Sequence, residues 1–287
     1  MKNHIVPKCL LRAWSAVSDD GRLQEFRIEQ GVLRTRRTAP AGTGYQEDLF
    51  LLPRDPSAGG DRHEIENHHL RIADNDGARV LDQLRATAPD SLATNQRRAL
   101  ASFLKSLLVR RPEFYRKTAE EAKAVWRQES EDAQPDYEAI AVNGSPPSLA
   151  EYCELHFPGQ AENQIFSSAL FSVLTDPTCL RDLVDLEWGV SDFSAAKHEL
   201  LLSDNPCLLV NTPRDSKFIL ALAISPTKAL FAVKGNAIVD QLTATEPSIL
   251  AQLLNRQSVA NASNRIYARN KLPFRFIKNR LRELGRL

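Results

Sequence analysis

The pattern of hydrophobic and polar residues predicts β structure over the N-terminal part of the chain. Residues 23–28 alternate between apolar and polar side chains, which is the period of a half-buried strand. Two further strands are predicted at residues 10–17 and 32–36, with intervening turns that contain Asp and Gly. We therefore expect a three-stranded meander. Residues 39–62 are rich in Pro, Gly and Asp and predict a loop, with a short ordered piece at 48–52.

From Glu64 onward the apolar residues follow the period of a helix. A second helix is predicted after Thr94, which fits the N-cap position. Residues 99–109 of this helix are apolar nearly all round and are therefore expected to be buried. Pro112 kinks that helix or starts a new one, which continues to about Glu131. The rest of this part is predicted as a loop at 132–147 and helices at 149–155 and 160–174.

The C-terminal part returns to β structure and ends in a helix and a basic tail. Strands are predicted at 183–188, 199–202, 207–210, 218–223 and 230–233, a helix at 247–260, and a partly helical tail after that. A meander, a helical middle and a returning β segment predict an α+β fold with one mixed core. We expect a single domain over 1–270 (β-meander and loop 1–62, helical 63–180, β plus helix 181–270) followed by the basic tail 271–287.

Charge is segregated along a chain whose formal net charge is only +1. Residues 264–287 contain eight bases and one acid, and residues 95–117 contain seven bases and one acid, so the rest of the chain carries a net charge of −12. Such basic segments are either solvated helix faces or contacts for a polyanion such as nucleic acid. The candidate phosphate contacts of the tail are Arg275, Lys278, Arg280 and Arg282.

Composition restricts the class of protein further. Apolar residues make up 43% of the chain and charged residues 25%, which is typical of a globular protein. The sequence contains no apolar run long enough to span a membrane and no secretory signal, and its four cysteines form no Cys-x-x-Cys pair. We therefore expect a cytoplasmic protein with reduced thiols and no membrane partner.

Candidate chemistry lies near both ends of the chain. Residues 203–206, Ser-Asp-Asn-Pro, stand between two apolar runs at the end of a predicted strand, where binding sites are commonly built. A hairpin turn in which Asp204 and Asn205 bond their own backbone accounts for the same residues. His4 fits a general acid or base at neutral pH, and the alternative is a frayed terminus. No nucleophile elbow and no Gly-rich phosphate loop are present.

Two carboxylates of the helix after Glu64 need an explanation. Glu66 and His69 have the i, i+3 spacing of a metal-ligand pair, but carboxylate-bridged metal sites need a second such pair, which the sequence lacks. An acidic helix start is the alternative. Asp74 lies at the edge of the apolar stripe, so we expect it to pair with Arg110 or Arg111. That pairing is either structural or part of a site.

Taken in order, the short motifs of the chain resemble one bacterial family, called domain of unknown function 4238. The motifs are the residues 4–7, Leu11-Arg12-Ala-Trp14, 21–23, 48–50, Glu66 with Asp74, Arg111-Pro112, 203–206 and Ser225-Pro226. The resemblance spans His4 to about Tyr267. It implies that His4 and Asp204 are site residues, and it implies no activity. Two positions depart from the family pattern: Ile5 stands in place of an aromatic residue, and Glu47 stands in place of an arginine before Asp48.

Two functions remain open from the sequence. The first is a nuclease-like, phosphodiester-cleaving effector of defence or toxin type. In it His4 deprotonates the nucleophile, Asp204 orients it or holds Mg²⁺ or Mn²⁺, and Arg111 stabilises phosphoryl charge. Asn205 completes the catalytic set, and Ser203, Glu66, Asp74 and Arg110 support it. The alternative is a non-catalytic sensor or binding module for a small anion, nucleic acid or protein. In either case we expect His4, Asp204 and Arg111 to share one cleft.

Overall fold

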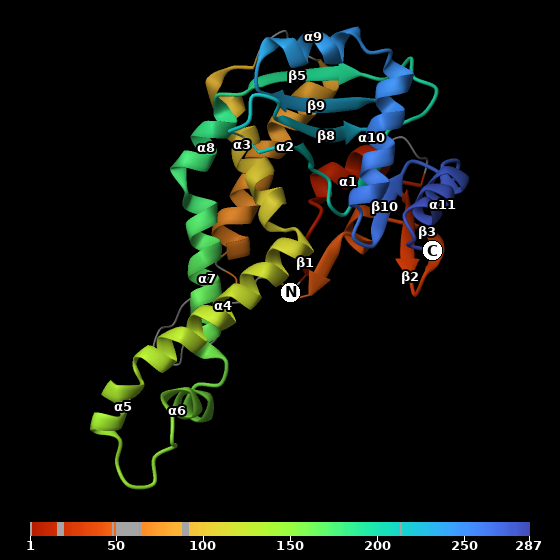
Figure 1. Ribbon diagram of the computed structural model, residues 1–287. Helices are drawn as coiled ribbons and strands as arrows, with labels where there is room; N and C mark the ends of the chain where they lie inside the picture. Colours follow the sequence, from red (N-terminus) through yellow and green to blue (C-terminus); the bar gives the residue numbers. More distant parts are fainter. Residues whose placement is uncertain are drawn as a thin grey trace.

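The computed structural model describes residues 2–15, 20–47, 49, 63, 65–87, 92–212 and 214–287. Its described strands form three antiparallel sheets, and its helices cover and connect them (Figure 1). One sheet has the order β3-β2-β10-β6, the second β5-β9-β8-β7, and the third contains β1 and β4. N-terminal strands, central helices and C-terminal strands confirm the predicted α+β class.

The first four-stranded sheet joins the two ends of the chain. Strands β2 (Leu23–Glu29) and β3 (Val32–Thr38) form the predicted hairpin. Its two-residue loop has positive φ at Gln30 and Gly31, as a type I′ turn requires. Strand β10 (Arg265–Ala268), which the sequence pattern did not reveal, pairs with β2 on one side and with β6 (Leu202–Ser203) on the other.

The predicted strand at residues 10–17 is wrong, because residues 8–15 form helix α1 (Lys8–Ser15). Its buried residues, Leu10, Leu11, Trp14 and Ser15, follow a helical period. The Trp14 indole N–H donates to the Leu200 carbonyl oxygen at 3.0 Å, which ties α1 to the C-terminal half of the chain. The expected three-stranded meander is therefore a hairpin preceded by a helix.

The chain beyond the hairpin contains a strand where a loop was predicted. After the 3₁₀ turn η1 (Pro40–Gly42), β4 (Tyr45–Glu47) pairs with β1 (Lys2–His4), so the N-terminus is held in a sheet. The ordered piece predicted at 48–52 lies, apart from Leu49, outside the described residues.

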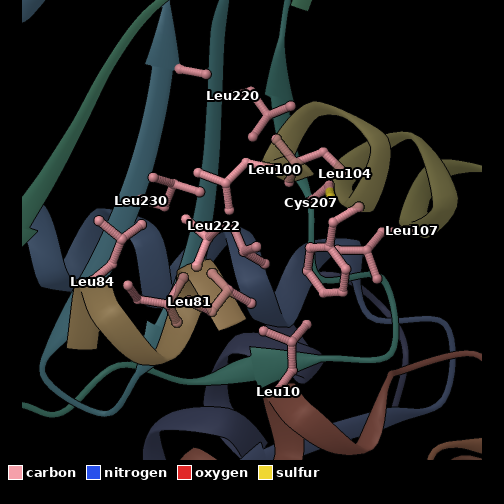
Figure 2. Packing of buried hydrophobic residues seen from close by; sticks show 14 of the residues in the cluster. Leu10, Leu81, Leu84, Leu100, Leu104, Leu107, Cys207, Leu220, Leu222 and Leu230 are labelled. Atoms are coloured by element: carbon pink, nitrogen blue, oxygen red, sulfur yellow. The ribbon is translucent and has the colours of Figure 1, made fainter. Parts of the chain in front are cut away.

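Two helices form the centre of the core, as their apolar stripes predicted. A π-helical segment η2 (Ile65–Leu70) leads into α2 (Arg71–Ala86), which packs on α3 (Thr94–Val109). The N-cap of α3 is Ala93, not the predicted Thr94, and the Gln96 side chain accepts from its N–H. Figure 2 shows Leu81 and Leu84 packed among leucines of α3 and of the second sheet.

A pair of long helices extends from this core. Helix α4 (Pro112–Asp132) begins at Pro112 and packs along α7 (Gln160–Thr175). Helices α5 (Gln134–Ile140) and α6 (Leu149–His156) cap the far end of this pair (Figure 1). Residues 132–147 are thus not all loop. Helix α8 (Pro177–Val184), capped by the Asp176 side chain, occupies the start of the strand predicted at 183–188.

The second four-stranded sheet packs on the central helices α2 and α3. Its strands are β5 (Glu187–Asp192), β7 (Leu208–Val210), β8 (Ile219–Ser225) and β9 (Lys228–Val233). Of the strand predicted at 199–202, only Leu202 lies in a strand, β6, and residues 199–201 are irregular. Helices α9 (Asn236–Ala244), which was not predicted, α10 (Pro247–Asn261) and α11 (Phe274–Glu283) follow.

Helix α11 contains most of the basic tail. Its Ile277 and Leu281 are buried in a cluster with Phe26, Val259 and Ile266. The division into a domain and a tail at residue 270 stays a prediction. None of the described helices is long and apolar enough to cross a membrane.

Candidate functional site

Two consecutive arginines mark the corner between α3 and α4. Arg110 is the C-cap of α3, and Arg111 is the N-cap of α4. Pro112 occupies the first turn of α4 and forces Arg111 into an extended conformation with φ −65° and ψ 129°. The two side chains consequently belong to different polar groups, which meet at this corner.

Arg110 belongs to a group built around the N-terminal strand. Its side chain is fully buried and donates two hydrogen bonds to Asp74, at 2.9 and 3.1 Å. Burial raises the pKa of the Asp74 carboxyl, and the positive charge of Arg110 opposes that shift. Asp74 therefore has the arginine partner that its position at the core boundary required.

His4 lies in the same group, on β1 opposite Tyr45. It is 8% exposed, and its Nε2 atom is buried without a hydrogen-bond partner among the described residues. Burial, assisted by the positive charges of Lys8, Arg110 and Lys2, lowers the pKa of His4 to about 4. The imidazole is therefore neutral at pH 7.

The neighbouring Asn3 was not singled out in the sequence, although it precedes His4. Its amide donates to Glu66 Oε2 at 3.3 Å, while its Oδ1 is buried without a partner in the described part of the chain. Burial raises the pKa of Glu66, and Arg110 opposes the shift. Burial thus holds His4 in its neutral form and favours the protonated form of Glu66.

The second polar group follows strand β6. Asp204 is 3% exposed, and its carboxylate accepts from the backbone N–H groups of Ser263 (2.7 Å), Asn264 (2.8 Å) and Arg265 (2.9 Å). Ser203 Oγ donates to the Asn205 carbonyl oxygen at 2.7 Å. The three bonds to Asp204 fix the turn between α10 and β10. The carboxylate of Asp204 is therefore used up by the backbone of that turn and does not face solvent.

An open cleft of about 660 Å³ lies beside this turn. It is lined by Arg111, Arg116, Asn205 and Arg286, with Glu113 as its one acidic residue. Asn205 Oδ1 and Arg111 Nε are buried and have no hydrogen-bond partner in the described structure. The cleft thus combines a net positive charge with a donor and an acceptor that are both unsatisfied.

Further contacts position the cleft's side chains. Arg286 donates to the Ser263 carbonyl oxygen at 2.6 Å, which connects the end of the chain to the turn held by Asp204. Glu113 contacts Arg111 at 3.5 Å and accepts from Ser263 Oγ at 3.3 Å. Arg116 and Arg286 were not named individually from the sequence. Their membership of the two basic segments was the only indication of a role.

The structure therefore places the predicted site residues in two groups. Arg111 and Asn205 share the cleft, with Ser203 and Asp204 behind it. His4, Glu66, Asp74 and Arg110 form the other group. No hydrogen bond or charge interaction that the described residues make joins His4 to Asp204. A single site containing both stays a prediction.

The remaining candidates concern the tail and a metal. On α11, Arg280 pairs with Glu283 at 2.9 Å, while Arg275 and Arg282 are exposed. Their contact with nucleic acid stays a prediction. Within the described ranges, no three His, Cys, Asp or Glu side chains are arranged to hold a metal ion, so the sequence-based suggestion of Mg²⁺ or Mn²⁺ gains no ligand set here.

Comparison with protein families shows a relationship over most of the chain. No curated protein and no solved structure matches the chain. The family described as "Protein of unknown function (DUF4238)" matches residues 2–272, which includes both polar groups and ends just before α11. The resemblance inferred from the motifs is thereby confirmed, and the chain belongs to the DUF4238 family.

Proposed function

We propose that the protein binds a phosphate ester in the cleft lined by Arg111 and Asn205. The observation that carries this proposal is the set of three arginines that line the cleft, Arg111, Arg116 and Arg286, against one acidic residue. Two of the lining residues also hold a buried atom without a partner, Arg111 Nε and Asn205 Oδ1. Such atoms cost about 1–3 kcal/mol each, so a side-chain adjustment that brings them to a ligand gains energy. Arg111 Nε requires an acceptor such as a phosphate oxygen, and Asn205 Oδ1 requires a donor such as a sugar hydroxyl.

The charge of the cleft supports the same ligand. The two basic segments of the sequence converge there, with Arg111 and Arg116 coming from residues 95–117 and Arg286 from residues 264–287. Guanidinium groups match phosphate oxygens in both charge and geometry. Nucleotides and nucleic acid carry phosphate and hydroxyl groups together, so we propose them as the ligand class.

Titration with fluorescently labelled RNA and DNA oligonucleotides and with free nucleotides tests this proposal. Changing Arg111 to Ala should weaken binding about 10- to 100-fold, because a charge-assisted hydrogen bond contributes about 1.5–3 kcal/mol. For the oligonucleotides, each lost phosphate contact should also reduce the magnitude of the salt slope by about 0.7–0.9. Arg34→Ala is the matched control, since Arg34 is an exposed arginine on β3.

The melting temperature of Arg111→Ala and Arg34→Ala decides whether a weakened variant is still folded. Wild-type protein that binds none of these ligands at low salt contradicts the proposal. Equal affinities of Arg111→Ala and Arg34→Ala would place the binding elsewhere on the surface.

Phosphodiester cleavage is the second candidate function, and the unpaired Nε2 atom of His4 is the observation that favours it. A neutral imidazole with an unsatisfied Nε2 is the form that accepts a proton from a nucleophile, and Glu66 lies in the same group. In this proposal Arg111 stabilises phosphoryl charge, and Asp204 positions the turn beside the cleft. A nuclease-like role in defence or as a toxin stays a hypothesis that rests on this chemistry.

Incubation with labelled RNA and DNA, with and without Mg²⁺ or Mn²⁺, tests cleavage. We expect His4→Gln to abolish product formation while ligand affinity is retained, because binding is assigned to the other group. Asp204→Asn should lower stability, with activity surviving in the folded fraction. Full activity of folded His4→Gln would exclude His4 as the base and leave the binding function.

A further inference from the structure

The two helices α4 and α7 carry an acidic arm away from the rest of the molecule. We define the arm as residues 118–162, which contain ten acidic and two basic residues, a net charge of −8. Figure 1 shows α5 and α6 at the end of this arm, far from the sheets and from α11. Most of the negative charge that balances the two basic segments is therefore concentrated in one projecting element.

The tip of the arm has a defined structure of its own. Tyr137 is 7% exposed, its ring lies 5.7 Å from that of Tyr152, and its hydroxyl donates to the Pro146 carbonyl oxygen at 2.7 Å. The Gln134 side chain donates to the Pro147 carbonyl oxygen and accepts from the Leu149 N–H. These contacts fix α5 against α6, so the tip presents a preorganised surface.

That surface is apolar as well as acidic. Ile140 is 78% exposed, Val142 75% and Leu155 68%, and Phe157 follows at 48%. Nearer the body, Trp126 lines an open hollow of about 460 Å³ on the stem of the arm. Large apolar side chains on a rigid, projecting element are typical of an interaction surface.

The complementary surface lies on the same chain. Leu272 is 87% exposed, the highest value of any large apolar side chain in the described residues, followed by the three at the tip of the arm. It stands in residues 269–275, here called the Leu272 segment, which contain three bases and no acid. Among the described residues, the four most exposed large apolar side chains are thus divided between one acidic and one basic surface.

We propose that the acidic arm of one copy of the chain binds the Leu272 segment of a second copy. The arm does not reach the Leu272 segment of its own chain, because the arm and α11 lie at opposite sides of the molecule (Figure 1). Contact between two arms is disfavoured because each carries a net charge of −8. Contact between arm and Leu272 segment unites opposite charges and covers exposed apolar side chains on both surfaces.

The arrangement has a consequence for the size of the assembly. Because the two surfaces differ, a reciprocal exchange around a twofold axis closes as a dimer, whereas head-to-tail contact extends to larger species. Sedimentation velocity of the full-length protein distinguishes these products and measures the affinity. We expect association at concentrations up to about 100 μM, which populate a complex of micromolar Kd.

Salt and charge reversal test the pairing. Raising NaCl from about 0.1 M to about 1 M shortens the Debye length from about 10 Å to about 3 Å and should weaken association at least about tenfold. The first variant combines Asp136→Lys with Glu151→Lys on the arm, and the second combines Lys271→Glu with Arg275→Glu. The second variant should be monomeric alone, because its segment changes from +3 to −1 and then has the same sign as the arm. The first, whose arm falls from −8 to −4, should associate more weakly than the wild type. Mixing the two should restore association through the unchanged arm of the second and the unchanged segment of the first.

Apolar substitutions supply an independent measurement. Leu272→Ser and Ile140→Ser should each weaken self-association about tenfold or more while the melting temperature stays unchanged, since both side chains are exposed. Ile249→Ser, at 55% exposure on α10, is the matched control and should associate as the wild type does. Wild-type protein that remains monomeric at the highest concentration and lowest salt overturns the proposal. Charge-reversed variants that associate alone as well as the wild type overturn it too.

Discussion

Replacing His4 by Gln should abolish a pH dependence of stability that this residue gives to the protein. The pKa of His4 falls from 6.5 to about 4 on folding, because burial and three nearby positive charges disfavour the imidazolium. The unfolded chain therefore binds more protons than the native state between those two values. It follows that the contribution of His4 to stability is complete above pH 6.5 and is lost as the pH falls toward 4.

The size of the effect follows from the two pKa values. Relative to pH 8, the free energy of unfolding should fall by about 1.4 kcal/mol at pH 5.5 and by about 2.6 kcal/mol at pH 4.5, counting His4 alone. Buried carboxyl groups also begin to titrate at the lower pH. The difference between wild type and His4→Gln, which keeps a polar side chain of similar size, isolates the histidine.

Urea unfolding followed by tryptophan fluorescence is a suitable assay, because Trp14 and Trp188 are buried. The wild type should lose about 1.4 kcal/mol more than His4→Gln between pH 8 and pH 5.5, at equal m-values. A histidine NMR titration measures the pKa of His4 directly. If the stability of the two proteins varies with pH in parallel, or if the titration midpoint of His4 lies near 6.5, the reasoning is refuted. His4 would then titrate as a solvated imidazole does.

Three substitutions test the packing and polar contacts that hold the site. Asp204→Ala removes the acceptor of three backbone N–H groups and should lower the free energy of urea unfolding by about 3–5 kcal/mol. A loss below about 1 kcal/mol would mean that water replaces the carboxylate. Asp74→Ala leaves the fully buried Arg110 without its partner and should lower the free energy of unfolding by about 3–5 kcal/mol. An unchanged melting temperature would show that this arginine finds other acceptors. Gly77→Ala places a methyl group within 2.5 Å of Phe103. This clash should lower the free energy of unfolding by about 1–3 kcal/mol in thermal unfolding, despite the better helix propensity of Ala. A stabilised variant would show that α2 and α3 separate easily.

The helical core could be predicted from the sequence because its pattern is local. The buried residues Val80, Leu81 and Leu84 of α2 recur at helical spacing, and α3 is apolar on nearly every side. Helix α1 was mistaken for a strand because its eight residues provide only two turns of periodicity. Strands β4 and β10 were missed because each is short and is stabilised by a partner far away in the sequence.

The candidate site was predictable only in part, for the same reason. Arg111 and Asn205 could be named because each belongs to a short motif with an evident polar role. Arg116 and Arg286 carried only the signal of a basic segment, and they join the cleft because the fold brings α4 and the C-terminus together. The pairing of Asp74 with Arg110 rather than Arg111 depends on the direction that the chain takes at Pro112, which sequence spacing does not specify.

The position of β10 between β2 and β6 has a consequence for the order in which the chain is made. Arg265 pairs with Arg27, although 238 residues separate them. At a synthesis rate of about 5–20 residues per second, β10 leaves the ribosome about 12–48 s after the strand that it covers. During that time one edge of the β2–β3 hairpin is unpaired, and open edges invite pairing with other chains. Until β10 pairs with β2, the open edge of the hairpin leaves the nascent protein exposed to aggregation.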